Sequence, residues 1–220
     1  MLQPGGRLEH LEGTPTQLHI SYANVSIWNK DMEKFLQGNR SHVFLLAEHR
    51  LDEAMFQRKA PLLTTWSRDA FFEAAERTGN YLWATSGGVA ILPRRHLQVT
   101  RPDPDLMSFA RSGHTADATA RWTAAVVRLK SVSLLLVVLY LKTGEELSEF
   151  NLSILQQVFL LVSNFAGPAL VMGDWQMEPH TLEKCFWIKR LGLTIMTPRG
   201  VDSTCNAGKK RMLDFVLGSN

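Results

Sequence analysis

At 220 residues and 24.8 kDa, the chain fits one domain with a core large enough to fold without disulfides or structural metals. Its formal charge of +3 and pI near 9.0 permit an anionic partner without requiring one. With 45% hydrophobic and 20% charged residues, the composition is typical of a globular protein and excludes a low-complexity chain.

The cysteines and the apolar runs limit the class of protein further. Cys185 and Cys205 cannot form a disulfide framework, and neither has a second cysteine at metal-ligand spacing. The amino terminus has no apolar core of the kind a signal peptide needs, and the longest apolar run, Leu134 to Leu141, is too short to span a membrane. We therefore expect an intracellular protein with no membrane segment and no disulfide partner. A nuclear location is compatible with these features, and the oligomeric state is left open.

The amino-terminal part of the chain predicts a leader followed by a βαβ unit. Residues 1–16 are polar and rich in Gly and Pro, which is typical of a flexible leader, and a single domain is expected over residues 17–220. The unit consists of a strand from Leu18 to Tyr22, a helix marked by Met32, Phe35 and Leu36 that ends at Gly38, and a buried strand from Val43 to Ala47. A right-handed crossover makes the two strands parallel and neighbours. Asn24 and Glu48 follow these strands and are therefore expected at one end of the sheet.

The middle of the chain predicts a helix, a hairpin and a long exposed loop. The helix is expected from Ser67 to Thr78, the hairpin joins residues 81–84 to 89–92 through Ser86-Gly87-Gly88, and the loop runs from Thr100 to Ala120. The two glycines would supply the positive φ of a tight turn. The loop is expected because Pro, Asp, Ser, Gly and Thr dominate there without periodicity.

The carboxyl-terminal part predicts a second crossover that leads to an aspartate. The expected elements are strands at 123–130 and 131–141, a helix from Phe150 to Phe165, a strand from Pro168 to Gly173, a helix from Thr181 to Arg190 and a strand from Met212 to Leu217. Asp174, at the end of a buried strand, is placed to hold a metal ion or to activate water; an aspartate that caps a turn is the alternative. Asp214 lies within the last strand, where a carboxylate is costly to bury without a partner or a metal.

Six of these segments resemble, in order and approximate spacing, the endonuclease/exonuclease/phosphatase superfamily, and within it the apurinic endonucleases and the endonuclease domains of non-LTR retrotransposons. They are Asn24, Glu48 in Leu46-Ala47-Glu48-His49-Arg50-Leu51, Gly87-Gly88-Val89-Ala90-Ile91-Leu92, Tyr140, Gly173-Asp174 and Leu213-Asp214-Phe215. The likeness runs from about Ile20 to the carboxyl end. It implies an α/β fold, a four-layer sandwich of two packed mixed β-sheets flanked by helices. It also implies cleavage of phosphodiester bonds, with DNA as substrate and Mg²⁺, or alternatively Mn²⁺, as cofactor.

The resemblance also implies a role for each matching polar residue. Glu48 would be the metal ligand, with Asn24 close beside it. Asp174 would orient or deprotonate the attacking water. Tyr140 would approach the scissile phosphate, and Asp214 would orient a catalytic histidine.

The chain departs from the family in two places. Gln176 stands where the family has Asn, so an amide is kept on a side chain that is one methylene longer. The family's terminal Ser-Asp-His segment is absent from this sequence, which suggests a carboxyl-terminal truncation that removes the last strand. As substitutes for the histidine, His49 is expected to point away from Glu48 and His180 to be an exposed loop residue.

Three functions remain open. The first is a Mg²⁺-dependent DNA endonuclease of retroelement type. The second is a catalytically inactive, truncated fragment that keeps the fold and at most binds nucleic acid or protein. The third is a phosphatase that acts on a small phosphorylated molecule.

Overall fold

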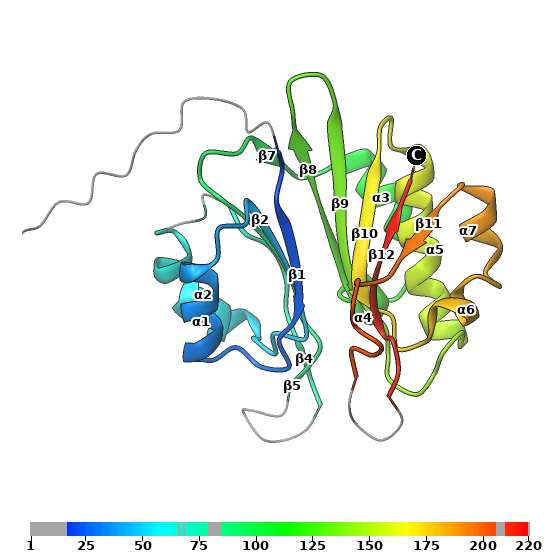
Figure 1. Ribbon diagram of the computed structural model, residues 1–220, viewed down its shortest axis with the longest axis horizontal. Helices are drawn as coiled ribbons and strands as arrows, with labels where there is room; N and C mark the ends of the chain where they lie inside the picture. The colour runs from blue at the N-terminus through cyan, green and yellow to red at the C-terminus, as the bar shows by residue number, and fades with distance from the viewer. Residues whose placement is uncertain (1–16, 66, 68, 79–84, 206–209, 220) are drawn as a thin grey trace, which may run out of the picture.

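The computed structural model describes residues 17–65, 67, 69–78, 85–205 and 210–219, so the predicted leader lies outside the described residues. Two β-sheets pack face to face, and helices cover the outer face of each, which makes four layers (Figure 1). The predicted α/β sandwich is therefore confirmed.

The first sheet has four strands and the second has six. The first has the order β1 (Ile20–Asn24), β2 (Val43–Ala47), β6 (Val89–Pro93), β3 (Phe71–Glu73). The second has the order β11 (Thr194–Met196), β12 (Asp214–Gly218), β10 (Ala169–Asp174), β9 (Ser133–Tyr140), β8 (Trp122–Arg128), β7 (Val99–Thr100). A separate pair is formed by β4 (Glu76–Arg77) and β5 (Thr85–Ser86).

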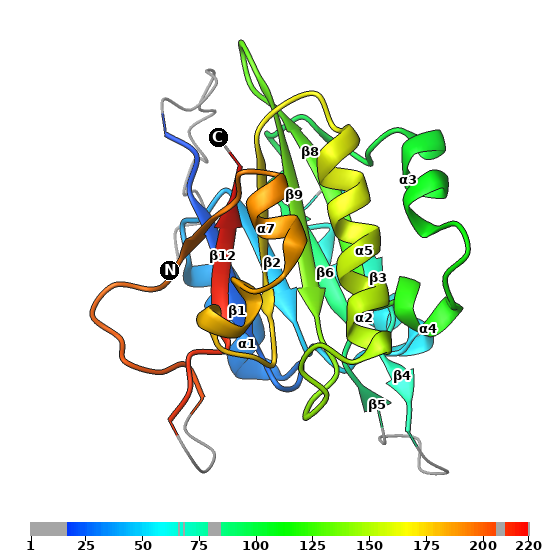
Figure 2. The ribbon, with the colours of Figure 1, turned by 90° about the vertical axis from the view of Figure 1, so that its right-hand side faces the viewer.

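Seven helices are found in the described part of the chain. They are α1 (Lys30–Gly38), α2 (Glu53–Leu63), α3 (Pro104–Arg111), α4 (Ala116–Thr119), α5 (Glu149–Asn164), α6 (Pro179–Leu182) and α7 (Phe186–Arg190). The first two lie over the first sheet (Figure 1), and α5 lies along the second sheet with α3 beside it (Figure 2). No helix among the described residues has the length and apolar character needed to cross a lipid bilayer.

Strand alternation explains why two sheets stack in this way. In β2, Val43 and Leu45 face the core between the sheets, where they meet residues such as Leu136 and Val138 of β9. The alternate residue Phe44 packs into the outer core against α1 and α2. Because both faces of β2 are covered, all five of its residues are buried, as its continuous apolar sequence predicts.

Both predicted crossovers are present. Strands β1 and β2 are parallel neighbours whose pairing ends at Asn24 opposite Ala47. Strands β9 and β10 are also parallel neighbours, and their pairing ends at Tyr140 opposite Asp174. The connecting helix α5 is capped by Ser148, whose hydroxyl accepts a hydrogen bond from the backbone N–H of Asn151.

The prediction of a helix from Ser67 to Thr78 is wrong. The chain forms the short strands β3 and β4 there, and Phe71 pairs with Ile91 at the edge of the first sheet. The helix occurs earlier, as α2, where the Asp52 side chain accepts a hydrogen bond from the backbone of Met55. The same apolar residues suit an edge strand, and pairing with β6 decides between the two structures.

The prediction of a loop from Thr100 to Ala120 is also wrong, because its polar residues cap two helices. Asp103 and Thr115 accept hydrogen bonds from the first turns of α3 and α4, and Pro104 begins α3.

Three smaller differences concern strands and a split helix. Residues 81–84 of the predicted hairpin lie outside the described residues, and Thr85–Ser86 pairs with β4 rather than with β6. The helix predicted at 181–190 is divided into α6 and α7, and Asp214 begins β12 rather than lying inside it.

Candidate active site

The polar residues that follow the strands meet in one cavity of about 720 Å³. All six of the residues predicted to form a site line it, namely Asn24, Glu48, Tyr140, Asp174, Gln176 and Asp214. Strands β1, β9 and β10 end at this cavity, Glu48 directly follows β2, and β12 begins there. The fold thus brings together residues that are up to 190 positions apart in the sequence, between Asn24 and Asp214.

Three donors hold the buried carboxylate of Asp174, which is only 3% exposed. Its Oδ2 accepts hydrogen bonds from Nδ2 of Asn24 at 2.8 Å and from Nε2 of Gln176 at 2.6 Å. Its Oδ1 accepts a longer bond of 3.2 Å from the backbone N–H of Gln176. The extra methylene of Gln176 is therefore accommodated by folding the side chain back onto Asp174.

The second carboxylate, Asp214, lies directly opposite Asp174 on the antiparallel neighbour β12. Its Oδ1 accepts a hydrogen bond of 2.7 Å from the phenol of Tyr22. Thr204 Oγ1 accepts hydrogen bonds from the backbone N–H groups of Leu213 and Asp214, both at 2.9 Å. Strand β1 of the first sheet is therefore linked to β10 and β12 of the second sheet. The links are the hydrogen bonds Asn24–Asp174 and Tyr22–Asp214.

Tyr22 and Thr204 were not predicted as site residues. The sequence held a signal for Tyr22, because residues two apart on a strand share a face and Asn24 is two positions further along β1. Thr204 belongs to the segment between β11 and β12, and its spacing to Asp214 gives no comparable signal.

Burial and like charge shift the acid constants of these groups. Burial raises the pKa of Asp174 to about 7, the neighbouring charge of Asp214 adds to this, and Glu48 raises it further. Burial also raises the pKa of Asp214, against the hydrogen bonds from Tyr22 and Thr204, which lower it. Burial and the charge of Asp214 raise the pKa of the Tyr22 phenol, which therefore remains a protonated donor. A carboxyl with a pKa raised in this way is suited to accept a proton near neutral pH.

Three residues that line this cavity have a strained backbone conformation. Ser26, Glu48 and Gln176 all line it, and they have φ angles of 53°, 59° and 52° in the left-handed region that favours glycine. Such conformations cost free energy and persist where the surrounding structure imposes them, commonly at functional sites. Two of the six predicted site residues, Glu48 and Gln176, are thus held in conformations that are unfavourable for their residue types.

Neither candidate histidine reaches the cavity wall. His49 is fully buried on the opposite side of the chain, where its ring stacks on Phe72 and its Nδ1 accepts a hydrogen bond from the backbone of Leu51. Burial lowers its pKa to about 4, so the ring stays neutral. The side chain of His180 is 66% exposed on α6, beside Glu178. The exposure of His180 is as the sequence predicted, but it lies in α6 rather than in a loop.

The carboxylates of the cavity suit a divalent ion that keeps part of its water shell better than an ion that is enclosed entirely by protein ligands. Among the described residues, no group of three or more His, Cys, Asp or Glu side chains has the arrangement of a preformed metal site. Mg²⁺ keeps several waters and commonly binds through one or two carboxylates. Glu48 is the available ligand, because its side chain is 15% exposed and its contact is a 2.9 Å ion pair with Arg50. Glu48 is therefore the residue of this cavity that could hold a hydrated divalent ion.

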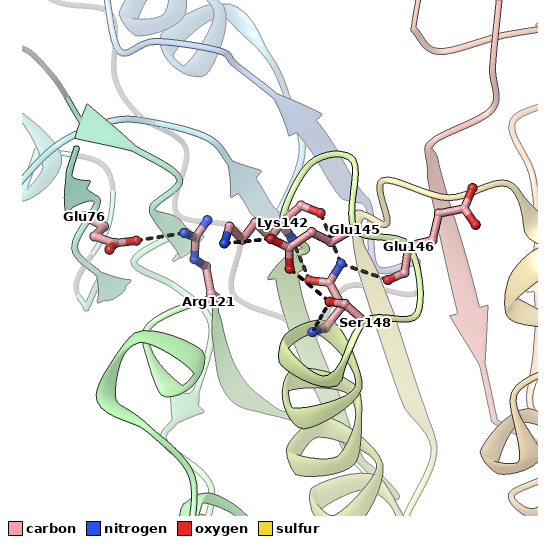
Figure 3. Close-up of polar contacts among 7 residues, drawn as sticks. Glu76, Arg121, Lys142, Glu145, Glu146 and Ser148 are labelled. Carbon is pink, nitrogen blue, oxygen red and sulfur yellow. Dashed lines mark hydrogen bonds and ion pairs between the residues drawn. The ribbon is translucent and has the colours of Figure 1, made fainter. Parts of the chain in front are cut away.

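The loop after β9 fixes Tyr140 and Thr143 at the cavity. The buried amide of Asn151 donates to the carbonyls of Lys142 and Glu146 and accepts from the backbone N–H of Lys142. Figure 3 shows this network with the ion pair of 2.7 Å between Lys142 and Glu145. These hydrogen bonds hold the loop that carries Thr143, whose Oγ1 lies 3.4 Å from the Tyr140 phenol.

Comparisons with known proteins identify the fold. A scan against protein-family models finds no match, and neither does a search of curated proteins. Among solved structures, the endonuclease domain of TRAS1, a telomere-specific non-LTR retrotransposon, has a TM-score of 0.60 at 13% identity, over 91% of this chain and 83% of that one.

Three further solved structures have a similar fold. Humanized D. rerio TDP2 has a TM-score of 0.64 at 13% identity, over 92% of this chain and 83% of its own. D. rerio TDP2 complexed with single strand DNA product has a TM-score of 0.58 at 12% identity, over 94% and 85%. An endonuclease/exonuclease/phosphatase family protein from Leptotrichia buccalis C-1013-b has a TM-score of 0.53 at 13% identity, over 93% and 88%. The chain therefore has the endonuclease/exonuclease/phosphatase fold.

Proposed function

We propose that the cavity hydrolyses phosphodiester bonds of DNA with the help of a divalent metal ion, Mg²⁺ or alternatively Mn²⁺. The observation that carries the proposal is the buried carboxylate of Asp174, which is oriented by three donors and has a pKa raised to about 7 by burial and by Asp214. DNA is supported as the substrate class because D. rerio TDP2, of the same fold, was solved with single strand DNA product. The similarity to the TRAS1 endonuclease domain supports a retroelement-type enzyme.

In this proposal, Asp174 takes a proton from the attacking water. Because the amide groups of Asn24 and Gln176 both bond to Oδ2, that oxygen is held in place while Oδ1 carries the weaker contact and is freer to accept the proton. Burial raises the pKa of Asp174 toward neutrality, and Asp214 assists because its charge raises that pKa further.

Two other residues complete the proposed site. A divalent ion bound at Glu48 would supply positive charge to the phosphoryl oxygens. The phenol of Tyr140, at the cavity wall, donates a hydrogen bond to the phosphate. Tyr22 has a separate role, because its phenol binds Asp214 and keeps that carboxylate oriented.

Incubation of the purified chain with supercoiled plasmid tests the proposal. We expect Mg²⁺-dependent nicking that disappears with a chelator and in Asp174→Ala. The matched control is Asp105→Ala, which removes an exposed carboxylate from α3 and should nick at the wild-type rate. Absence of nicking by a folded wild-type chain, or nicking that survives Asp174→Ala, would refute the proposal. Hydrolysis of soluble phosphomonoesters without nicking would indicate the phosphatase alternative.

A further inference from the structure

A buried arginine lies behind the proposed site without lining its cavity. Arg121 precedes β8, and its side chain is only 8% exposed. A guanidinium is costly to bury unless it is paired. Its Nη2 forms an ion pair of 2.8 Å with Glu76 of β4, whose own side chain is 45% exposed, and Figure 3 shows the two side chains extended toward each other.

The guanidinium is also packed between two aromatic rings. Its central carbon lies 5.4 Å from the ring centroid of Tyr140 and 5.9 Å from that of Phe150. Both distances are within the range at which a cation is attracted to an aromatic ring. The backbone adds a further link, because the N–H of Tyr140 donates to the carbonyl of Arg121 at 2.9 Å. Arg121 therefore contacts Tyr140 through its main chain and through its side chain.

The turn that follows β5 closes against the same pair. Gly87 has a φ of +76°, and a Cβ built on it would lie 3.1 Å from Nη1 of Arg121 and 3.3 Å from the Tyr140 ring. A side chain at this position would therefore displace one of the two groups. The glycine allows the backbone to pack directly on the contact between the guanidinium and the ring.

We infer that Arg121 is a positioning residue that fixes the Tyr140 ring for the proposed hydrolysis, and that Glu76 holds Arg121 in turn. The inference rests on the proposed function for its consequence in catalysis. Within the described part of the chain, the phenol has one side-chain hydrogen-bond contact, a weak one of 3.4 Å to Thr143, so hydrogen bonding restrains the ring little. Packing against the guanidinium sets the ring plane and thereby the direction of the phenolic O–H.

A double-mutant cycle separates positioning from general support of the fold. Arg121→Lys keeps the charge and loses the planar group that stacks on the ring. We expect a fall in kcat of about tenfold with little change in KM, because a small misplacement of a reacting group lowers the rate at unchanged binding. In a Tyr140→Phe background the same substitution should cause no further loss. Additive losses would overturn the inference, since they would show that Arg121 acts independently of Tyr140.

A spectroscopic measurement tests the contact without relying on activity. With ring-labelled tyrosine, the chain gives signals from three tyrosines, and Tyr140→Phe identifies the one of interest. Arg121→Lys should shift the Tyr140 signal and leave that of Tyr22 in place. An unshifted Tyr140 signal would overturn the inference. If Arg121→Lys does not fold, Glu76→Gln replaces it in both experiments, with the same expected direction. Glu76 is half-exposed, so this substitution should leave the fold intact. An inactive wild-type chain with a shifted signal would refute the proposed function and leave the positioning contact supported.

Discussion

Substituting Asp174 by asparagine should stabilise the metal-free protein while it abolishes the proposed activity. The substitution keeps the size of the side chain. With the amide oxygen in the place of Oδ2, the bonds of 2.8 and 2.6 Å from Asn24 and Gln176 are retained. With the amide nitrogen in the place of Oδ1, only the 3.2 Å bond from the backbone of Gln176 is lost. The main change is therefore the removal of a buried charge.

The size of this effect follows from the pKa of Asp174. Burial raises it from the ordinary value of 3.8 to about 7, a shift of about 3 units, and each unit corresponds to about 1.4 kcal/mol. A carboxyl whose pKa is raised in the folded state contributes fully to the stability of the fold below pH 4. This contribution is lost as the pH rises through 7, because the folded protein must then hold a buried charge. The amide of the Asp174→Asn variant does not titrate and would have no such dependence. The variant should therefore exceed the wild type by at most about 4 kcal/mol at pH 8.

Urea denaturation in chelator at pH 5 and pH 8 measures this difference. The stability advantage of Asp174→Asn should grow by roughly 3 kcal/mol between the two values, since the wild type loses stability up to pH 7. Asp105→Asn, at an exposed position, is the matched control and should track the wild type. An advantage that does not grow with pH, or a variant less stable than the wild type at pH 8, would refute the assignment of a buried, charge-repelled carboxylate.

Three further substitutions test the strain and the contacts of the site. Gln176→Asn relieves part of the strain at a φ of 52°, about 0.5 to 1 kcal/mol, but it shortens the side chain that donates to the buried Asp174, which costs about 1 to 3 kcal/mol. The free energy of unfolding in urea should therefore fall, and a rise would show that strain outweighs this hydrogen bond. Tyr22→Phe should destabilise the fold by about 1 to 3 kcal/mol at pH 8, because it removes the phenol that donates to the half-buried Asp214, and an unchanged free energy of unfolding would contradict this cause. Gly88→Ala should lower the melting temperature steeply, by the equivalent of about 3 kcal/mol or more, because its Cβ would lie 2.3 Å from the His49 ring at a φ of +84°; a melting temperature equal to that of the wild type would show that the ring moves freely.

The parts of the fold with strong local signals could be predicted from the sequence. Strands β2, β9 and β10 are apolar runs. Helix α1 joins β1 to β2 and helix α5 joins β9 to β10, and both helices have a clear helical period. Both crossovers and the ends of their strands therefore follow from the sequence pattern. Asn24, Glu48 and Asp174 were found because each stands at such an end, whereas Tyr140 became a candidate only through the resemblance to the family. The edge strands β3, β4, β7 and β11 have two or three residues each, which is too short for a period to be recognised.

The geometry of the site depends on contacts that the sequence does not encode locally. The partner of Asp214 is Tyr22 on the other sheet, and the pairing of Asp174 with Asp214 needs the register of β10 and β12. The left-handed backbone of Glu48 was equally hidden, although it is what separates Glu48 from His49. Gln176 was recognised as a departure from the family, and only the structure shows that its amide bends back to bind Asp174.

The rate of plasmid nicking by Asp174→Asn, relative to the wild type, tests the central claim most directly. Both proteins are measured in Mg²⁺ at pH 8, after denaturation has shown that the variant is folded at least as stably as the wild type. Loss of the general base should lower the initial rate by about 10² or more. A stable variant that nicks at the wild-type rate would show that Asp174 does not activate the attacking water, and that the cavity is not the site of phosphodiester cleavage proposed for it.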